Sequence, residues 1–268
     1  MKLSPRLTMA VLALFLAACA ACGGSEREQE MHTALRAVAS GSRPAYAAHD
    51  PEGNKLWKKT QAFYEKRSYA GAWVEGAKPG AQMDELIEAL RDSATEGLDP
   101  DLYNVSMLEE RRAEASKGFL TDKGFDPKEA GALDVWLTYL YMKYASDIAD
   151  GLSDLAHADP AWKIKPEKFE PQAHLEKALA DGSIKSSLAQ LTPRVPEYQR
   201  LRELLVRYKD QQQKGGWPKV PPVKLKPGQK SPHIAALAKR LAASGDYQGS
   251  VPSDGSASPY SPELQEAV

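Results

Sequence analysis

The residues with the most specific chemistry are two cysteines, Cys19 and Cys22, and both lie close to the N-terminus. A thiol can be acylated or oxidised to a disulfide, and its thiolate can act as a nucleophile or ligate a metal ion. The sequence from residue 23 to Val268 contains no further cysteine. We therefore predict that this larger part has no disulfide, no thiolate nucleophile and no cysteine-ligated metal.

The segment before the cysteines has the layout of an export signal. Lys2 and Arg6 form a short positive region, and the apolar run from Leu7 to Ala18 contains no charged residue. A helix needs roughly 20 apolar residues to span a bilayer, so this run is too short for a permanent membrane span. The pattern predicts a processing signal within residues 1–22.

The sequence around the first cysteine, Leu-Ala-Ala-Cys at residues 16–19, resembles the lipobox of bacterial lipoproteins. The cysteine of a lipobox is acylated and becomes the first residue, so we predict lipidation of Cys19. Cys22 is the alternative, because a tether-like Gly-Gly-Ser follows it, and an ordinary secretory signal with incidental cysteines is a third interpretation. Neither cysteine is followed by aspartate. By resemblance to lipoproteins of two-membrane bacteria, this predicts an outer-membrane anchor that faces the periplasm.

No group of residues after the signal has the spacing of a known metal-binding or catalytic motif. The five histidines are widely separated, and no two form an H-x-x-x-H or H-E-x-x-H pair: they are His32, His49, His157, His174 and His233. Nucleophile-elbow, phosphate-binding and dinucleotide-binding motifs are absent from the sequence as well. We predict no metal, no cofactor and no catalytic residue.

Four aspartates form the densest acidic group: Asp147, Asp150, Asp154 and Asp159. They lack the D-x-D-x-D-G pattern of a calcium loop, which favours a solvated helix end over a cation site. Glycan hydrolysis needs only two carboxylates, so the 36 acidic residues leave that reaction open.

A basic segment, from Lys214 to Lys230, contains five lysines, four prolines and Trp217 but no acidic residue. It could meet an anionic polymer, with the lysines as point charges and the indole as a stacking surface. The prolines favour a stiff connector with a solvated surface. The net charge of the whole chain is −1, which argues against a nucleic-acid partner because phosphate neutralisation requires a basic surplus.

Apolar residues recur with helical spacing from Leu56 onward. Four stripes carry this prediction: Met83, Leu86, Ile87, Leu90 and Ala94, ending at Gly97; Leu133, Leu137, Leu140, Tyr144 and Ile148; Tyr198, Leu201, Leu204, Leu205 and Tyr208, begun by Pro196; and Ile234, Leu237, Ala238 and Leu241, begun by Ser231 and Pro232. The second stripe lies in a helix that is apolar all round, with aromatic residues from 136 to 144, which favours core packing over a ligand groove.

The fold class that these patterns predict is mainly α, with short extended connections from Trp217 to Lys230. Few large apolar residues occur between residues 23 and 55, which we interpret as a tether leading into a weak first helix.

Short motifs follow one another in order between residues 57 and 247. They are Phe63-Tyr64, Arg67, Tyr69, Ala72-Trp73, Gly97–Pro100, Tyr103, Leu133-Asp134, Leu137-Thr138, Tyr144, Asp147, Asp159-Pro160, Trp162, Leu191–Tyr198, Trp217-Pro218, Leu225–Gly228 and Leu237–Asp246. Their order and spacing resemble the N-terminal scaffold domain of murein L,D-transpeptidases. Where that family usually has Gly-Arg after the Tyr144 helix, this chain has Gly151-Leu152.

The resemblance implies an irregular helical scaffold domain at residues 56–247. Complete relatives continue with a small helical peptidoglycan-binding module and a catalytic domain with a Ser-His-Gly-Cys-x-Arg motif, which this sequence lacks. Residues 248–268 resemble a linker and the opening helix of that module, with Ser261 as cap and Pro262 in the first turn. We expect Leu264, Ala267 and Val268 to have no partners, and the C-terminus to be truncated within the module.

The resemblance also implies a role, because complete relatives join two peptidoglycan stem peptides through an acylated cysteine. We expect a non-catalytic scaffold portion of a lipid-anchored L,D-transpeptidase in cell wall remodelling. Its expected partners are peptidoglycan and, through the anchor, a membrane. A peptidoglycan-associated structural lipoprotein without a catalytic domain and a glycan hydrolase remain alternatives.

Overall fold

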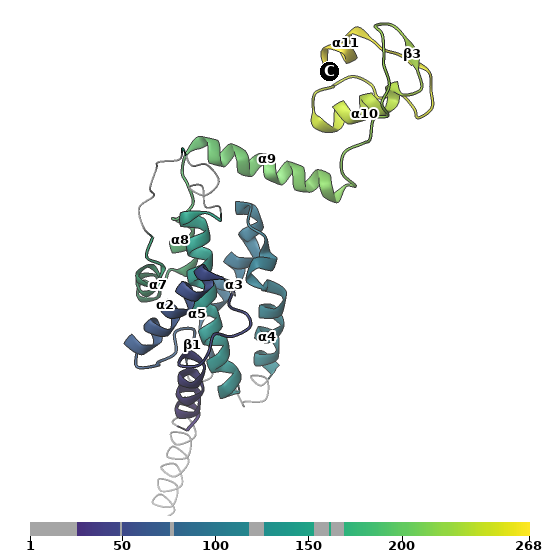
Figure 1. The fold of residues 1–268 in the computed structure, drawn as a ribbon. Helices are drawn as coiled ribbons and strands as arrows, with labels where there is room; N and C mark the ends of the chain where they lie inside the picture. Colours follow the sequence, from purple (N-terminus) through teal and green to yellow (C-terminus); the bar gives the residue numbers. More distant parts are fainter. Residues whose placement is uncertain (1–25, 49, 76–77, 118–125, 153–160, 162–168) are drawn as a thin grey trace, which may run out of the picture. The chain divides into compact units, whose positions relative to one another are not determined.

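The computed structural model describes residues 26–48, 50–75, 78–117, 126–152, 161 and 169–268. It is mainly helical, which confirms the predicted fold class, and each of its described strands is two residues long. The chain divides between Arg194 and Val195 into two compact units, and Figure 1 shows the elements of each. No described helix is both long and apolar enough to cross a membrane.

The described part of the first unit consists of helices and a short hairpin. Residues 26–39 are helical, and the further elements are α2 (Pro51–Lys66), β1 (Val74–Glu75), β2 (Lys78–Pro79), α3 (Ala81–Arg91), the 3-10 helices η1 (Asp92–Glu96) and η2 (Pro100–Tyr103), α4 (Val105–Lys117), α5 (Pro127–Asp150), α7 (Pro171–Ala180) and α8 (Ile184–Ala189). Strands β1 and β2 pair antiparallel, with Val74 opposite Pro79.

Helix α5 is the centre of the first unit, as its all-round apolar sequence predicts. The Asp126 side chain accepts hydrogen bonds from the backbone amides of Lys128 and Glu129, and Pro127 occupies the first turn, so both features fix the N-terminus. Helices α2, α3, α4 and α7 and strand β1 all pack against α5 (Figure 1). The aromatic residues from 136 to 144 are buried, which confirms that they belong to the core.

The first helix that the sequence predicted is present at residues 26–39, and it packs closely against α5. Met31, Leu35 and Ala39 are buried in the same core as α5. A Cβ atom on Gly131 of α5 would lie 2.9 Å from the backbone nitrogen of Leu35, so only glycine permits this approach. The sequence signal was weak because the buried face of this helix has few large apolar residues, whereas tertiary packing stabilises the helix.

Helix α3 and the 3-10 helix η1 end as predicted. The α-helix stops at Arg91, and five residues of 3-10 helix continue to Glu96. Gly97 then adopts a left-handed conformation with φ of 80°, which a glycine reaches without steric cost. The predicted stripe is buried at Met83, Leu86, Ile87 and Leu90.

The second unit contains α9 (Pro196–Gln213), β3 (Lys230–Ser231), α10 (Ile234–Ser244), β4 (Ser258–Pro259) and α11 (Pro262–Glu266). Helix α9 begins at Pro196 as predicted, and none of its residues is buried. Residues 217–229 contain neither helix nor strand, which confirms the predicted extended connection.

Helix α10 begins later than predicted. Its first residue is Ile234 and its N-cap is His233, because Ser231 instead pairs with Ser258 between β3 and β4. The Ser231 hydroxyl still accepts a hydrogen bond from the His233 amide at 3.2 Å.

The expectation that Leu264 has no partner was wrong. Leu264 is 2% exposed and packs with Ile234 and Ala238 of α10. The predicted cap of its helix is confirmed, because the Ser261 hydroxyl accepts from the Leu264 amide and Pro262 begins α11. Residues on both sides of position 247 therefore share one small core, although the sequence motifs had suggested a boundary there. Val268 is 72% exposed.

Candidate functional site

The carboxylate of Asp134 in α5 is completely buried and accepts several hydrogen bonds. Its Oδ2 accepts from the backbone amides of Trp73 (2.8 Å) and Val74 (2.9 Å), and its Oδ1 accepts from the amide of Ala72 at 2.9 Å. The hydroxyl of Tyr64 donates to Oδ1 at 2.7 Å. Burial raises the pKa of Asp134, while these donors act in the opposite direction. The carboxylate joins α2 and the β1 segment to α5.

Thr138 extends this network because it lies one helical turn after Asp134, on the same face of α5. Its hydroxyl oxygen accepts from the Trp73 indole nitrogen at 2.9 Å and lies 2.6 Å from the Tyr64 hydroxyl. Since Tyr64 donates to Asp134, Thr138 is left to donate to Tyr64. The four side chains form a chain of hydrogen bonds from indole to carboxylate in a dry environment, where such bonds reinforce one another.

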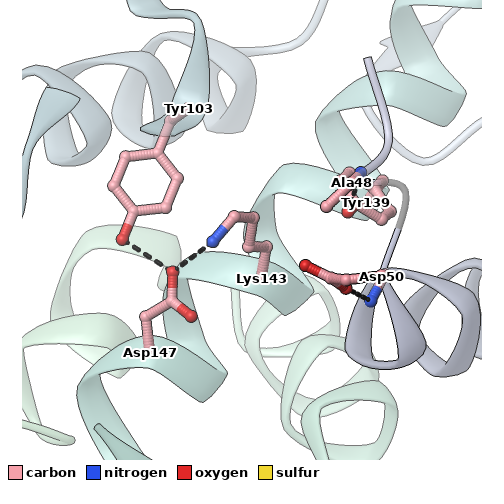
Figure 2. A network of polar contacts seen from close by, with 7 residues as sticks. Ala48, Asp50, Tyr103, Tyr139, Lys143 and Asp147 are labelled. Carbon is pink, nitrogen blue, oxygen red and sulfur yellow. Dashed lines mark hydrogen bonds and ion pairs between the residues drawn. The ribbon is translucent and has the colours of Figure 1, made fainter. Parts of the chain in front are cut away.

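A second network surrounds Asp147 near the C-terminal end of α5 (Figure 2). The hydroxyl of Tyr103, from η2, donates to Asp147 Oδ2 at 2.9 Å, and the ammonium group of Lys143 donates to the same oxygen at 2.7 Å. That ammonium also lies 5.2 Å from the centre of the Tyr103 ring. Burial and the neighbouring Asp147 raise the pKa of the Tyr103 hydroxyl, which keeps it protonated and able to donate.

Figure 2 also shows how the chain enters α2 beside α5. The backbone amide of Ala48 donates to the Tyr139 hydroxyl at 2.9 Å. The Asp50 carboxylate accepts from the Gly53 amide at 2.6 Å and thereby caps α2. These bonds hold Ala48 against α5 and fix the start of α2.

These networks position elements of the fold and do not resemble reaction centres. The Asp134 carboxylate is enclosed by donors, and Asp147 is held by a tyrosine and a lysine, so both are engaged in structural bonds. Among the described residues, no three His, Cys, Asp or Glu side chains are placed to hold a metal ion. The arrangement supports rigidity.

Only two of the four aspartates that could have formed a cation site lie among the described residues. Asp147 is bonded to Tyr103 and Lys143, and Asp150 is exposed at the end of α5. Asp154 and Asp159 lie outside the described residues, as do His49 and His157.

The described histidines occupy separate places. His32 lies with its Nε2 2.9 Å from the carbonyl oxygen of Ser68, and His233 is the N-cap of α10. His174 of α7 lies with its Nδ1 2.8 Å from the Tyr141 hydroxyl. Partial burial, and secondarily the charge of Lys177, lower the pKa of His174.

Trp217 does not present a free stacking surface. The guanidinium group of Arg240 lies over its ring at 4.1 Å from the centroid, and the Tyr208 ring meets it at 5.8 Å in an edge arrangement. The indole therefore fastens the basic segment to α9 and α10, which does not favour its role as a stacking plate.

Sequence reasoning missed two kinds of residue. It did not single out Lys143, although lysine and aspartate at positions i and i+4 of a helix commonly pair. It also missed the core residues of helix 26–39, whose signal was Met31, Leu35 and Ala39 at i, i+4 and i+8.

Cys19 and Cys22 lie outside the described residues, and their lipidation stays a prediction.

Six residues of the motifs that carry the sequence resemblance take part in these networks. Tyr64, Trp73, Asp134 and Thr138 form the first, and Tyr103 and Asp147 belong to the second. Comparison with protein families matches residues 58–205 to the Scaffold domain, which is more than half of the chain. The chain belongs to the Scaffold domain family. No curated protein and no solved structure matches it.

Both polar networks lie within the matched part of the Scaffold domain. Helix 26–39 precedes the match, yet its apolar face completes the core around α5. The physical core therefore extends beyond the matched region at its N-terminal side.

Proposed function

We propose that this chain is the non-catalytic scaffold portion of a lipid-anchored murein L,D-transpeptidase that acts in peptidoglycan cross-linking and cell wall remodelling. The observation that carries the proposal is where the motif residues lie in the fold. Six residues of the motifs that resemble this transpeptidase family take part in the two polar networks, and these networks lie within the Scaffold domain match: they are Tyr64, Trp73, Asp134, Thr138, Tyr103 and Asp147.

The chemistry of the networks supports a positioning role. A buried carboxylate is costly to desolvate unless donors surround it, and Asp134 has four donors from two other parts of the chain. Such a network specifies one arrangement of α2, β1 and α5. A rigid scaffold of this kind can hold a reaction centre elsewhere in the protein at a fixed place, since catalysis depends on orientation.

The membrane attachment in this proposal is lipidation of Cys19, with an outer-membrane location. Metabolic labelling with an alkyne-bearing fatty acid tests it in cells. Label should be lost in Cys19→Ser and kept in Cys22→Ser, and membrane fractionation should place the labelled protein in the outer membrane. Loss of label only in Cys22→Ser would move the anchor to the alternative cysteine, and label in neither protein would contradict lipidation.

The enzymatic role is tested by the cross-links of the wall. A strain that lacks the natural gene should lose cross-links between two diaminopimelate residues, as measured by chromatography and mass spectrometry of digested peptidoglycan. The wild-type gene and the exposed control Asp99→Ala should restore them, whereas Asp134→Ala should not. Unchanged cross-links in the deletion strain, together with weakened attachment of the envelope to the wall, would favour the structural lipoprotein. Soluble glycan products released from murein by the purified chain would favour the hydrolase.

A further inference from the structure

The second unit contains a long stretch without negative charge. About one residue in seven of the whole chain is acidic, yet residues 211–245 include no aspartate or glutamate. The same stretch contains six lysines and one arginine. This surplus stands out in a chain whose net charge is −1, so the stretch is a local source of positive potential.

Four of these cations are available to an external partner. Lys214 pairs with Asp210, and Lys239 pairs with Asp254. The other lysines are exposed, and no described residue forms an ion pair with them: they are Lys219, Lys224, Lys226 and Lys230. We refer to these four residues as the lysine row.

The backbone that carries the lysine row is fastened at several points. Trp217 is held between Arg240 and Tyr208 before the row begins. Leu225 packs against the small core of the unit, so the middle of the row is fixed as well. At the end of the row, Lys230 of β3 pairs with Pro259 of β4.

This fastening lowers the cost of binding. The segment between Trp217 and Lys230 includes four prolines and has no helix or strand before β3. An extended chain of this kind rises about 3.1 Å per residue, so Lys219 and Lys226 are separated along it by roughly 20 Å. When a partner contacts several of these charges at once, the segment loses little conformational entropy, because its backbone is already held in place.

We propose that the lysine row binds the carboxylates of peptidoglycan stem peptides, which form a linear array of negative charge along a glycan strand. This inference rests on the proposed function, because it takes peptidoglycan as the partner. An extended row of separated charges fits such a strand. A membrane-surface segment instead combines basic residues with an amphipathic helix or exposed aromatic rings, and here the row is not helical and Arg240 covers the indole.

Sedimentation with purified sacculi tests the proposal, using the full chain in a non-ionic detergent. The variant Lys219→Gln/Lys224→Gln/Lys226→Gln removes three exposed charges from the row. The matched control Lys55→Gln/Lys58→Gln/Lys128→Gln removes three exposed lysine charges from the first unit. The row variant should bind about tenfold more weakly at low salt, and the control should bind as the wild type does.

Two further arms identify the negative group. Sacculi whose carboxylates have been converted to amides should bind the wild type as weakly as untreated sacculi bind the row variant. Equal binding of wild type and row variant to untreated sacculi would overturn the proposal. Release of the chain from sacculi by micelles containing phosphatidylglycerol, but not phosphatidylcholine, would also overturn it and assign the row to a lipid surface. These outcomes do not depend on the cross-links measured above, so either hypothesis can fail alone.

Discussion

At the scale of single residues, the first unit depends on polar groups that cannot reach water. Asp134 is fully buried, and its negative charge is balanced by donors from Tyr64 and the backbone of residues 72–74. Apolar spacing predicts the burial of this part of α5, but no periodicity reveals which amides would face the carboxylate. The resemblance motifs named several members of the network without their contacts, because hydrogen bonding between distant segments depends on the tertiary fold.

Replacing Asp134 should destabilise the first unit strongly. The variant Asp134→Ala leaves three backbone amides and the Tyr64 hydroxyl without their acceptor, and we expect a loss of about 3–5 kcal/mol in the free energy of unfolding. Urea denaturation followed by circular dichroism measures it. Asp99→Ala, which removes an exposed carboxylate that caps η2, should cost about 1 kcal/mol. Similar losses for the two variants would contradict the role of the buried network.

The Tyr103 hydroxyl should contribute less. The variant Tyr103→Phe keeps the buried ring and removes the bond to Asp147, which retains its bond to Lys143. We expect a loss of about 1 kcal/mol, the usual contribution of one such hydrogen bond. Tyr247→Phe is the control, since its hydroxyl bond to Ser250 is exposed and should matter little in the same denaturation experiment. A loss above that of Asp134→Ala would mean that the Asp147 network dominates.

The pKa shift of His174 predicts a pH dependence of stability. Because the folded state lowers the pKa of His174 below its ordinary value near 6.5, the unfolded chain binds the extra proton more readily. Stability from this group is therefore complete above pH 6.5 and is lost as the pH falls toward the folded pKa. Denaturation midpoints at pH 7.5 and 5.0 should differ less in His174→Gln than in wild type. An unchanged pH profile in His174→Gln would refute this assignment.

At the scale of elements, the approach of helix 26–39 to α5 is the feature that apolar spacing could not anticipate. Spacing located α3, α5 and α9 and the apolar face of α10, because each has a regular stripe and a proline or glycine signal near its end. It underrated helix 26–39, whose stability depends on a glycine about 100 residues later in the chain.

Gly131→Ala tests this close approach. In an ordinary helix the change stabilises by about 1 kcal/mol, because alanine has the higher helix propensity. Here the added Cβ would meet the Leu35 backbone nitrogen at 2.9 Å, so we expect a net loss of about 1–3 kcal/mol. Ala132→Gly, at the next position of the same helix, should cost about 1 kcal/mol through propensity alone. A stabilising Gly131→Ala would show that helix 26–39 does not approach α5 as described.

At the scale of the whole molecule, the described residues form two separate apolar cores. The sequence motifs placed a boundary at residue 247, whereas the compact units divide after Arg194. The two positions differ because the first marks where the sequence motifs end, whereas the second marks where the packing between residues is sparse. Leu264 illustrates this, since its partners Ile234 and Ala238 lie across the expected boundary.

Leu264→Ala should therefore affect one unit only. Truncating this buried leucine should lower the free energy of unfolding of the second unit by about 2–4 kcal/mol. Because the core of this unit is small, that loss should be a large part of its stability. Limited proteolysis should release peptides from residues 195–268 of the variant while the first unit resists at the wild-type rate. The exposed control Leu201→Ala should show the wild-type pattern. Equal loss of protection in both units would contradict their separate cores.

If Cys19 is lipidated as proposed, the packing of helix 26–39 against α5 limits how far the first unit can move from the membrane. Cys19 and residue 26, the first described residue of this helix, are seven positions apart, and even a fully stretched chain of that length spans only about 24 Å. Helix α5 alone is about 36 Å long. The connection from the lipid anchor to this helix would then be shorter than α5, so the first unit would stay close to the membrane surface. How far it reaches into the wall would depend on its own length.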